Sequence, residues 1–265
     1  MHKTHLLCCV AAGQHMNSTL NTNCTIKALS FSFLVDGVFQ IKELTIDSLQ
    51  NILKWFRDHF RYTENKSKKE ESHFSDMLSS AFSLQESSVE SVFTYILVCL
   101  LRSIETVSIE VRLCYAINPV PLRPKNLILS DKQRERKNAT KIKNKEDVVK
   151  KGDKVTDTIL ISSDDEDVIA EPYSKSSGKK QRLRQFWLEV YFPTGKRWVY
   201  VDPVNGKVDD VSDIEKHTCN PLLYVFAFDN KNYVSDVTKK YNQKWTEREF
   251  RVNRVNEQWL QETLH

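Results

Sequence analysis

The chain has 265 residues, of which 40% are hydrophobic and 28% are charged, and it carries a formal net charge of +4 at neutral pH. This length allows one large domain or two small ones, and the composition allows a sizeable core. No apolar run approaches the roughly 20 residues that a transmembrane helix needs, which argues against a membrane-spanning protein.

Residues 1–120 are predicted to be ordered and mainly helical. Four segments place apolar side chains at helical spacing: 6–11, 49–60, 74–82 and 88–103. Asp47 and Ser48 are suitable N-cap residues for the second of these helices. Residues 29–35 alternate between apolar and polar side chains, which predicts an extended segment. Strict alternation over 107–117 predicts a strand with one buried face.

Residues 121–180 interrupt this order. They contain few aromatic residues and many Lys, Asp, Glu and Ser residues. Such a segment cannot bury enough apolar surface to offset its chain entropy, so we predict a long, disordered, charged insertion.

Residues 181–240 return to strand patterns, and residues 241–265 form a basic exit segment with a helix near its end. Four further strands are expected, at 186–192, 198–202, 222–228 and 233–237. Helices followed by a mostly antiparallel sheet are typical of the α+β class.

The six cysteines indicate an intracellular protein. They are Cys8, Cys9, Cys24, Cys99, Cys114 and Cys219. No pair has CxxC spacing and most lie in apolar runs, so we predict reduced core thiols and neither a metal site nor a cofactor. A secreted domain is the alternative, because residues 1–13 resemble a short signal peptide and Asn17 and Asn23 begin glycosylation sequons.

The order of motifs resembles the core of transglutaminase-like enzymes, which carry out Cys-His-Asp acyl transfer. Residues 186–191 read Phe-Trp-Leu-Glu-Val-Tyr, and residues 196–203 read Lys-Arg-Trp-Val-Tyr-Val-Asp-Pro. They are similar to the His strand and the Asp strand of the peptide:N-glycanase branch. The resemblance places the nucleophile at Glu90, the base at Gln185 and the orienting carboxylate at Asp202, so only the last of the three residue types is present.

No nearby residue replaces the missing pair. Cys99 lies two to three turns inside its helix and is expected to be a packed core thiol. Ser91 would lack a base, and His217 lies in a polar connection as a solvated loop residue. The chain is therefore predicted not to be an enzyme, and an active peptide:N-glycanase or transglutaminase-like hydrolase is the alternative.

Other segments resemble the xeroderma pigmentosum group C (XPC) family. They are 2–8, 53–56, 118–122 and 259–264, in the order in which that family has them. The resemblance implies a transglutaminase-like (papain-like) core and a nuclear, non-enzymatic role in damage recognition during nucleotide excision repair. It also implies binding to damaged or undamaged double-stranded DNA and to a ubiquitin-like adaptor. Three β-hairpin domains follow this domain in the family, and the chain stops at His265 before any of them.

Six cations within residues 239–254 are predicted to contact DNA, with Trp245 and Phe250 interleaved, although a solvated surface is the alternative. They are Lys239, Lys240, Lys244, Arg248, Arg251 and Arg254. Basic groups at 134–137 and 179–184 are candidate localisation or nucleic-acid patches. Residues 159–167, Ile-Leu-Ile-Ser-Ser-Asp-Asp-Glu-Asp, would suit a small-ubiquitin-like modifier or transcription factor IIH, or form an accidental apolar triplet in a linker.

Overall fold

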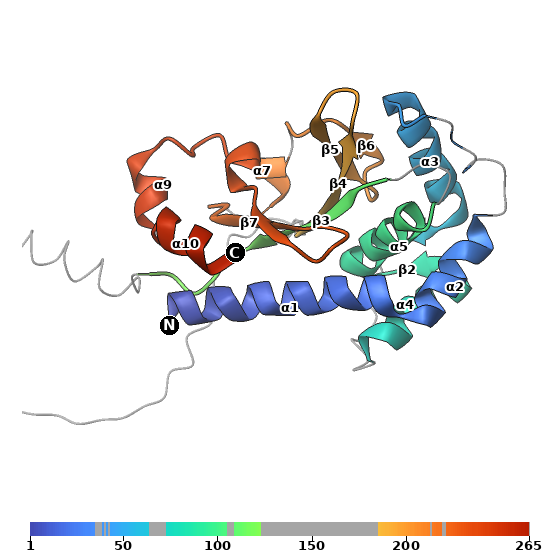
Figure 1. Ribbon diagram of the computed structural model, residues 1–265, viewed down its shortest axis with the longest axis horizontal. Helices are drawn as coiled ribbons and strands as arrows, with labels where there is room; N and C mark the ends of the chain where they lie inside the picture. The colour runs from blue at the N-terminus through green and yellow to red at the C-terminus, as the bar shows by residue number, and fades with distance from the viewer. Residues whose placement is uncertain are drawn as a thin grey trace, which may run out of the picture. The chain divides into compact units, whose positions relative to one another are not determined.

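The computed structural model describes residues 1–34, 39, 41, 43–63, 73–104, 109–122, 185–212, 214–218 and 221–264 (Figure 1). The predicted insertion lies outside these residues from position 123 onward. The segments 134–137, 159–167 and 179–184, and Cys219, also lie outside them.

The N-terminal half is helical, as its apolar periodicity predicts. Its helices are α1 (His2–Thr22), α2 (Cys24–Phe33), α3 (Ile46–His59), α4 (Phe74–Leu84) and α5 (Glu90–Arg102). The short strands β1 (Arg61–Tyr62) and β2 (Glu86–Ser87) pair in parallel beside them.

A six-stranded sheet follows, with every neighbouring pair antiparallel and the order β6-β5-β4-β3-β7-β8. Its strands are β3 (Val111–Ile117), β4 (Phe186–Phe192), β5 (Arg197–Asp202), β6 (Lys207–Val208), β7 (Tyr224–Phe228) and β8 (Val234–Asp236). The remaining helices are α7 (Ile214–His217), α8 (Thr238–Tyr241), α9 (Arg248–Val252) and α10 (Glu257–Leu264). The predicted α+β architecture is confirmed.

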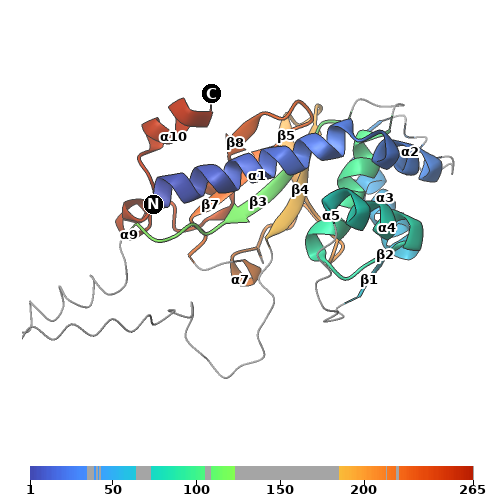
Figure 2. The same ribbon diagram turned by 90° about the horizontal axis from the view of Figure 1, so that it is seen from below.

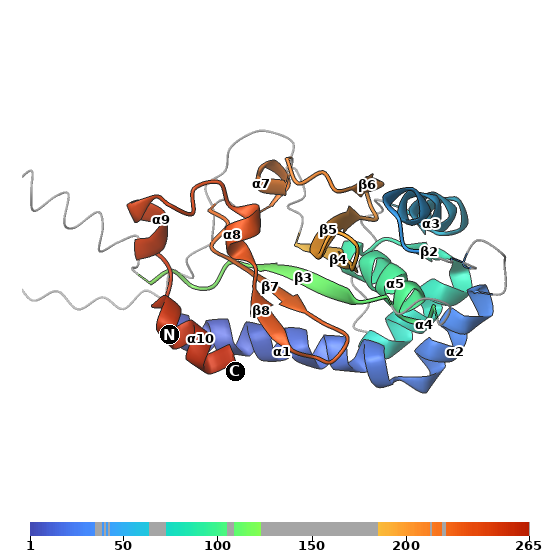
Figure 3. The ribbon, with the colours of Figure 1, turned by 45° about the horizontal axis from the view of Figure 1, so that its top comes forward.

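The longer helices α1 and α5 lie on one face of the sheet, and the short helices α7 and α8 pack on the other. The helix α5 packs on β3 and β4, and α1 runs along β3 and β7 (Figures 2 and 3). Because side chains alternate along a strand, Leu188 and Val190 enter the helical core while Trp187 faces the other way. On that second face, Trp187 packs with Tyr200 and with Tyr241 of α8.

Two predictions in the N-terminal half were wrong, one about residues 29–35 and one about the N-cap of α3. The segment 29–35 was expected to be extended, but residues up to Phe33 belong to α2. The side chain of Asn23 caps α2, because its Oδ1 accepts from the amides of Thr25 at 3.0 Å and Ile26 at 3.2 Å. Ile26 and Ser30, one turn apart, are buried, so helical burial overrides the apparent alternation.

The N-cap of α3 is Thr45 rather than Asp47 or Ser48. The Ser48 amide donates to Thr45 Oγ1 at 3.1 Å, and the Thr45 amide donates to Ser48 Oγ at 2.8 Å. This reciprocal pair forms a capping box, in which Ser48 takes the third helical position.

The N-terminal segment is part of the fold, and the prediction of a helix confined to 6–11 was too short. Leu6 and Val10 of α1 are buried in the core. Asn17, the first residue of one sequon, is also buried, and it donates to Asp229 O and Asn232 Oδ1, both at 2.9 Å. A glycan on Asn17 is therefore incompatible with this packing.

The prediction that the cysteines are core thiols holds for Cys99 and Cys114, which are buried. It was wrong for Cys8 and Cys24, which are exposed, and Cys9 is half-buried. Cys8 lies on the side of α1 that faces away from the sheet, whereas Leu6 and Val10 lie on the buried side. Among the described residues, no helix is both long and apolar enough to span a bilayer.

Candidate functional site

The three positions that the resemblance assigns to a catalytic triad lie on neighbouring elements. Glu90 is the first residue of α5, Gln185 precedes β4, and Asp202 ends β5. The helix α5 packs on β4, and β4 pairs with β5. Alternation places Gln185 and Asp202 on the sheet face opposite α5. That the three side chains share one cleft stays a prediction.

Asp202 makes the contacts of a turn-stabilising residue. It is only 1% exposed, and its Oδ1 accepts from the amides of Val204 at 3.0 Å and Asn205 at 3.1 Å. The Gly206 amide donates to the Asp202 carbonyl at 2.9 Å. Asp202 thus orders the turn between β5 and β6.

The thiol of Cys99 is not suited to be a nucleophile. Cys99 is buried in α5, and burial raises the pKa of its thiol to about 12. A thiol with this pKa stays protonated at neutral pH, and the thiolate is the reactive form. Ser91 is half-buried in the first turn of α5. His217, expected in a solvated loop, is half-buried at the end of α7.

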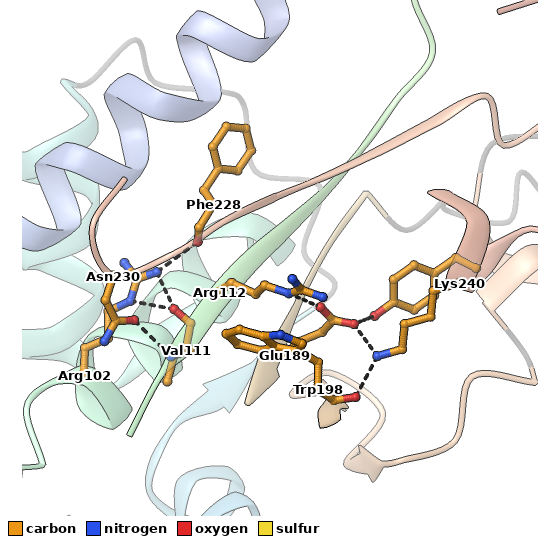
Figure 4. Close-up of polar contacts among 9 residues, drawn as sticks. Arg102, Val111, Arg112, Glu189, Trp198, Phe228, Asn230 and Lys240 are labelled. Atoms are coloured by element: carbon orange, nitrogen blue, oxygen red, sulfur yellow. Dashed lines mark hydrogen bonds and ion pairs between the residues drawn. The ribbon is translucent and has the colours of Figure 1, made fainter. Parts of the chain in front are cut away.

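The sheet face opposite α5 holds a buried carboxylate, Glu189 of β4, which is 0% exposed (Figure 4). Arg112 Nε donates to its Oε2, and Lys240 Nζ donates to its Oε1. The Tyr241 hydroxyl also donates to Oε1, at 2.5 Å. Burial raises the pKa of Glu189, but Arg112 and Lys240 outweigh it and hold the pKa below its ordinary value.

Both cations that pair with Glu189 also contact Trp198. The Arg112 guanidinium lies 4.1 Å from the centroid of the Trp198 ring, and Lys240 Nζ donates to the Trp198 carbonyl at 2.8 Å. Sequence reasoning took Glu189 as part of a motif and missed its charge pairs. The available signal was an acidic residue at an inward position of a strand, because buried charges are almost always paired.

A second network, centred on Arg102, ties the helices to the sheet (Figure 4). Its guanidinium makes five hydrogen bonds, with acceptors on α1, β3 and β7. The acceptors are Asn17 Oδ1, Asn21 Oδ1, the Val111 carbonyl twice and the Phe228 carbonyl. Burial lowers the pKa of Arg102 to about 10. Arg102 also lines a cavity of about 290 Å³ with Cys99 and Asn230.

The six cations predicted to contact DNA do not share one environment. Five are exposed: Lys239, Lys240, Lys244, Arg248 and Arg251. Lys240 is committed to Glu189, and the other four form no ion pair with any described carboxylate.

Arg254 lies inside the fold, which is at odds with its predicted place in the DNA-binding surface. It is 8% exposed, and it donates to the Leu223 carbonyl and to Asp236 Oδ2. Its guanidinium carbon lies 4.4 Å from the ring centroid of Tyr224, 4.7 Å from that of Trp245 and 5.8 Å from that of Phe250. Trp245 and Phe250 thus enclose Arg254.

Comparisons with known proteins give the chain its relatives. Residues 123–265, over half of the chain, match the family described as "Rad4 transglutaminase-like domain". The chain is 32% identical over 108 residues to the "DNA repair protein complementing XP-C cells homolog" of Drosophila melanogaster, covering 41% of this chain and 8% of that protein. It is 40% identical over 97 residues to the peptide-N(4)-(N-acetyl-beta-glucosaminyl)asparagine amidase of Arabidopsis thaliana, covering 35% and 13%.

A solved structure has the same fold. It is described as "Crystal structure of Rad4-Rad23 bound to a 6-4 photoproduct UV lesion", and it matches with a TM-score of 0.62 at 18% identity. The match covers 99% of this chain and 53% of that chain. The predicted transglutaminase-like fold is confirmed. The chain spans about half of that solved chain, and the alignments cover 8% and 13% of the two curated relatives.

Proposed function

The chain belongs to the family of Rad4 transglutaminase-like domains, and from this premise we propose that it is a nuclear, non-enzymatic DNA-binding scaffold in damage recognition during nucleotide excision repair. The fly relative is named as a DNA repair protein, and the structural neighbour is described as bound to a UV lesion. One observation carries the proposal for this chain: four exposed cations lie on one segment without a described acidic partner.

Those four cations suit contact with phosphates rather than with bases. Lys and Arg that neutralise DNA phosphates release counterions, so log K falls linearly with log salt at about 0.9 per contact for duplex DNA. Phosphate contacts carry no sequence information, because every nucleotide presents the same oxygens. Four contacts predict a slope of roughly −3.6 and binding that is weak near physiological salt.

The test is a salt titration of affinity for a short duplex, measured by fluorescence anisotropy. A quadruple alanine variant removes Lys239, Lys244, Arg248 and Arg251. The matched control removes four exposed lysines from other surfaces, Lys27, Lys54, Lys196 and Lys231. We expect the first variant to lose most of the slope and the control to keep it. Equal slopes in both variants would move the DNA-binding surface elsewhere.

A second candidate is favoured by the 40% identity to the Arabidopsis amidase. That chemistry needs a thiolate and a base, and the resemblance places Glu90 and Gln185 at their positions. The buried Cys99 thiol, with a pKa of about 12, is not a substitute. We therefore propose that the catalytic site is lost. If the chain released glycan from a denatured glycoprotein and Cys99→Ala abolished that release, the amidase function would be supported instead.

The scaffold role includes a protein partner. The structural neighbour contains Rad23, and we propose that this chain binds a Rad23-like ubiquitin-like adaptor. Residues 159–167 are a separate proposed contact, with a small-ubiquitin-like modifier or transcription factor IIH. Co-elution with each purified protein, for the full chain and for a chain without 159–167, tests the two contacts independently.

A further inference from the structure

A single carboxylate binds both ends of the segment that carries the exposed cations. Asp236 is the last residue of β8. Its Oδ1 accepts from Thr238, from the amide at 3.0 Å and from the hydroxyl at 2.5 Å. Its Oδ2 accepts from Arg254. Residues 238–254 are therefore closed into a loop, and we call them the basic loop.

The far end of the basic loop is sealed by Arg254. Only 5% of its side chain is exposed, and beside Asp236 it also binds the Leu223 carbonyl next to β7. Aromatic rings surround its guanidinium, with Tyr224 and Trp245 the nearest. A guanidinium enclosed in this way is stabilised by one carboxylate, one carbonyl and aromatic ring faces in place of water. Its position therefore depends on these partners.

The near end of the basic loop has a second fastening. Lys240 and Tyr241 of α8 both donate to the buried Glu189. Asn242, which is 6% exposed, donates from its side chain to the Leu222 carbonyl at 2.9 Å. Both ends of the loop are thus fixed to the sheet, through Glu189 on β4 and Asp236 on β8.

We propose that Asp236 and Arg254 are positioning residues, which hold the basic loop so that Lys239, Lys244, Arg248 and Arg251 meet DNA phosphates together. This inference rests on the proposed DNA binding. A segment ordered before binding loses less chain entropy when it meets the DNA. The residues that contact phosphates then determine the slope of log K against log salt. The positioning residues change the affinity at every salt concentration without changing that slope.

The experiment compares the full chain with Asp236→Asn. The amide keeps the shape of the side chain and removes its charge. We expect affinity for an undamaged duplex at fixed low salt to fall about tenfold, because one or two more side chains must then be ordered when the DNA binds. The slope of log K against log salt should stay within about 0.5 of the wild-type value. Amide hydrogen exchange over 239–253 should speed up, and exchange in α5 should not change.

Arg254→Lys is the second variant, because it keeps the cation and loses the planar guanidinium that reaches Leu223 and Asp236 together. It tests the same claim if Asp236→Asn does not fold, and a smaller drop in affinity at the same slope is expected. Wild-type affinity in either folded variant, despite faster exchange over 239–253, would overturn the positioning role. Absence of DNA binding by the wild-type chain would instead refute the proposed function, while the exchange data still report whether Asp236 closes the loop.

Discussion

Gly13 of α1 lies directly against the ring of Phe228 on β7, so closely that a Cβ atom at position 13 would stand 2.4 Å from the Phe228 Cζ atom. Phe228 is 0% exposed and cannot swing into solvent. The helix α1 therefore approaches the sheet at the distance that only glycine permits, and the N-terminal segment is an integral layer of the domain.

Gly13→Ala is expected to destabilise the protein by about 1–3 kcal/mol, because the added methyl group overpacks a rigid contact. Urea unfolding measures the change. Gly195→Ala is the matched control, since its Cβ would meet Arg197 Cγ at an ordinary 3.6 Å. The control should stay within about 0.5 kcal/mol of the wild type. Alanine has a higher helix propensity than glycine, so a loss of stability in Gly13→Ala comes from the Phe228 contact. Wild-type stability in Gly13→Ala would show that this contact yields without cost.

The pH dependence of stability should carry the signature of Glu189. Arg112 and Lys240 hold its pKa below the ordinary value in the folded protein despite burial. A depressed carboxylate contributes stability that is present above the unfolded pKa of about 4.3 and is lost as the pH falls through the folded pKa. We therefore expect the free energy of unfolding to fall steeply below about pH 4.3.

Glu189→Gln removes this dependence and leaves Arg112 and Lys240 without the buried carboxylate that pairs with them, at an expected cost of about 3 kcal/mol at neutral pH. Glu86→Gln, at an exposed position, is the control and should keep the wild-type pH profile. Unfolding curves from pH 3 to pH 7 compare the three proteins. An unchanged acid slope in Glu189→Gln would show that other carboxylates govern the acid limb.

The sequence predicted those elements whose apolar residues are close together in the chain. The strands β4 and β5 are short runs rich in aromatic and β-branched residues that end at turns, and the helices α4 and α5 have many apolar residues at helical spacing, so these local patterns were sufficient. The helix α2 was not predicted, because its buried residues are few and its N-cap, Asn23, was interpreted only as the start of a sequon. The burial of Arg254 was hidden, because its partner Asp236 lies 18 residues away and charge patterning counts cations without their partners.

The thiols should differ sharply in reactivity. Cys8 and Cys24 are exposed, whereas burial raises the pKa of Cys99 to about 12 and that of Cys114 well above its ordinary value. Because the thiolate is the reactive form, native protein treated with iodoacetamide at pH 8 should be labelled, among these four thiols, at Cys8 and Cys24 only. Peptide mass spectrometry reads the sites, and labelling of all four in urea is the control. Rapid native labelling of Cys99 would revive it as a nucleophile.

Arg102 should be irreplaceable even by lysine. Its guanidinium makes five hydrogen bonds that join α1 to β3 and β7, and a lysine has only three donors. Arg102→Lys leaves carbonyl or amide oxygens without a donor in a partly buried place, at an expected cost of about 2–3 kcal/mol. Arg248→Lys, on the surface of α9, is the control and should change stability by less than about 0.5 kcal/mol. Hydrogen exchange over the last turns of α1, around Asn17 and Asn21, should accelerate in Arg102→Lys alone. If that variant unfolds in urea at the same concentration as Arg248→Lys, the helical layer is held to the sheet by apolar packing and the Arg102 network is dispensable.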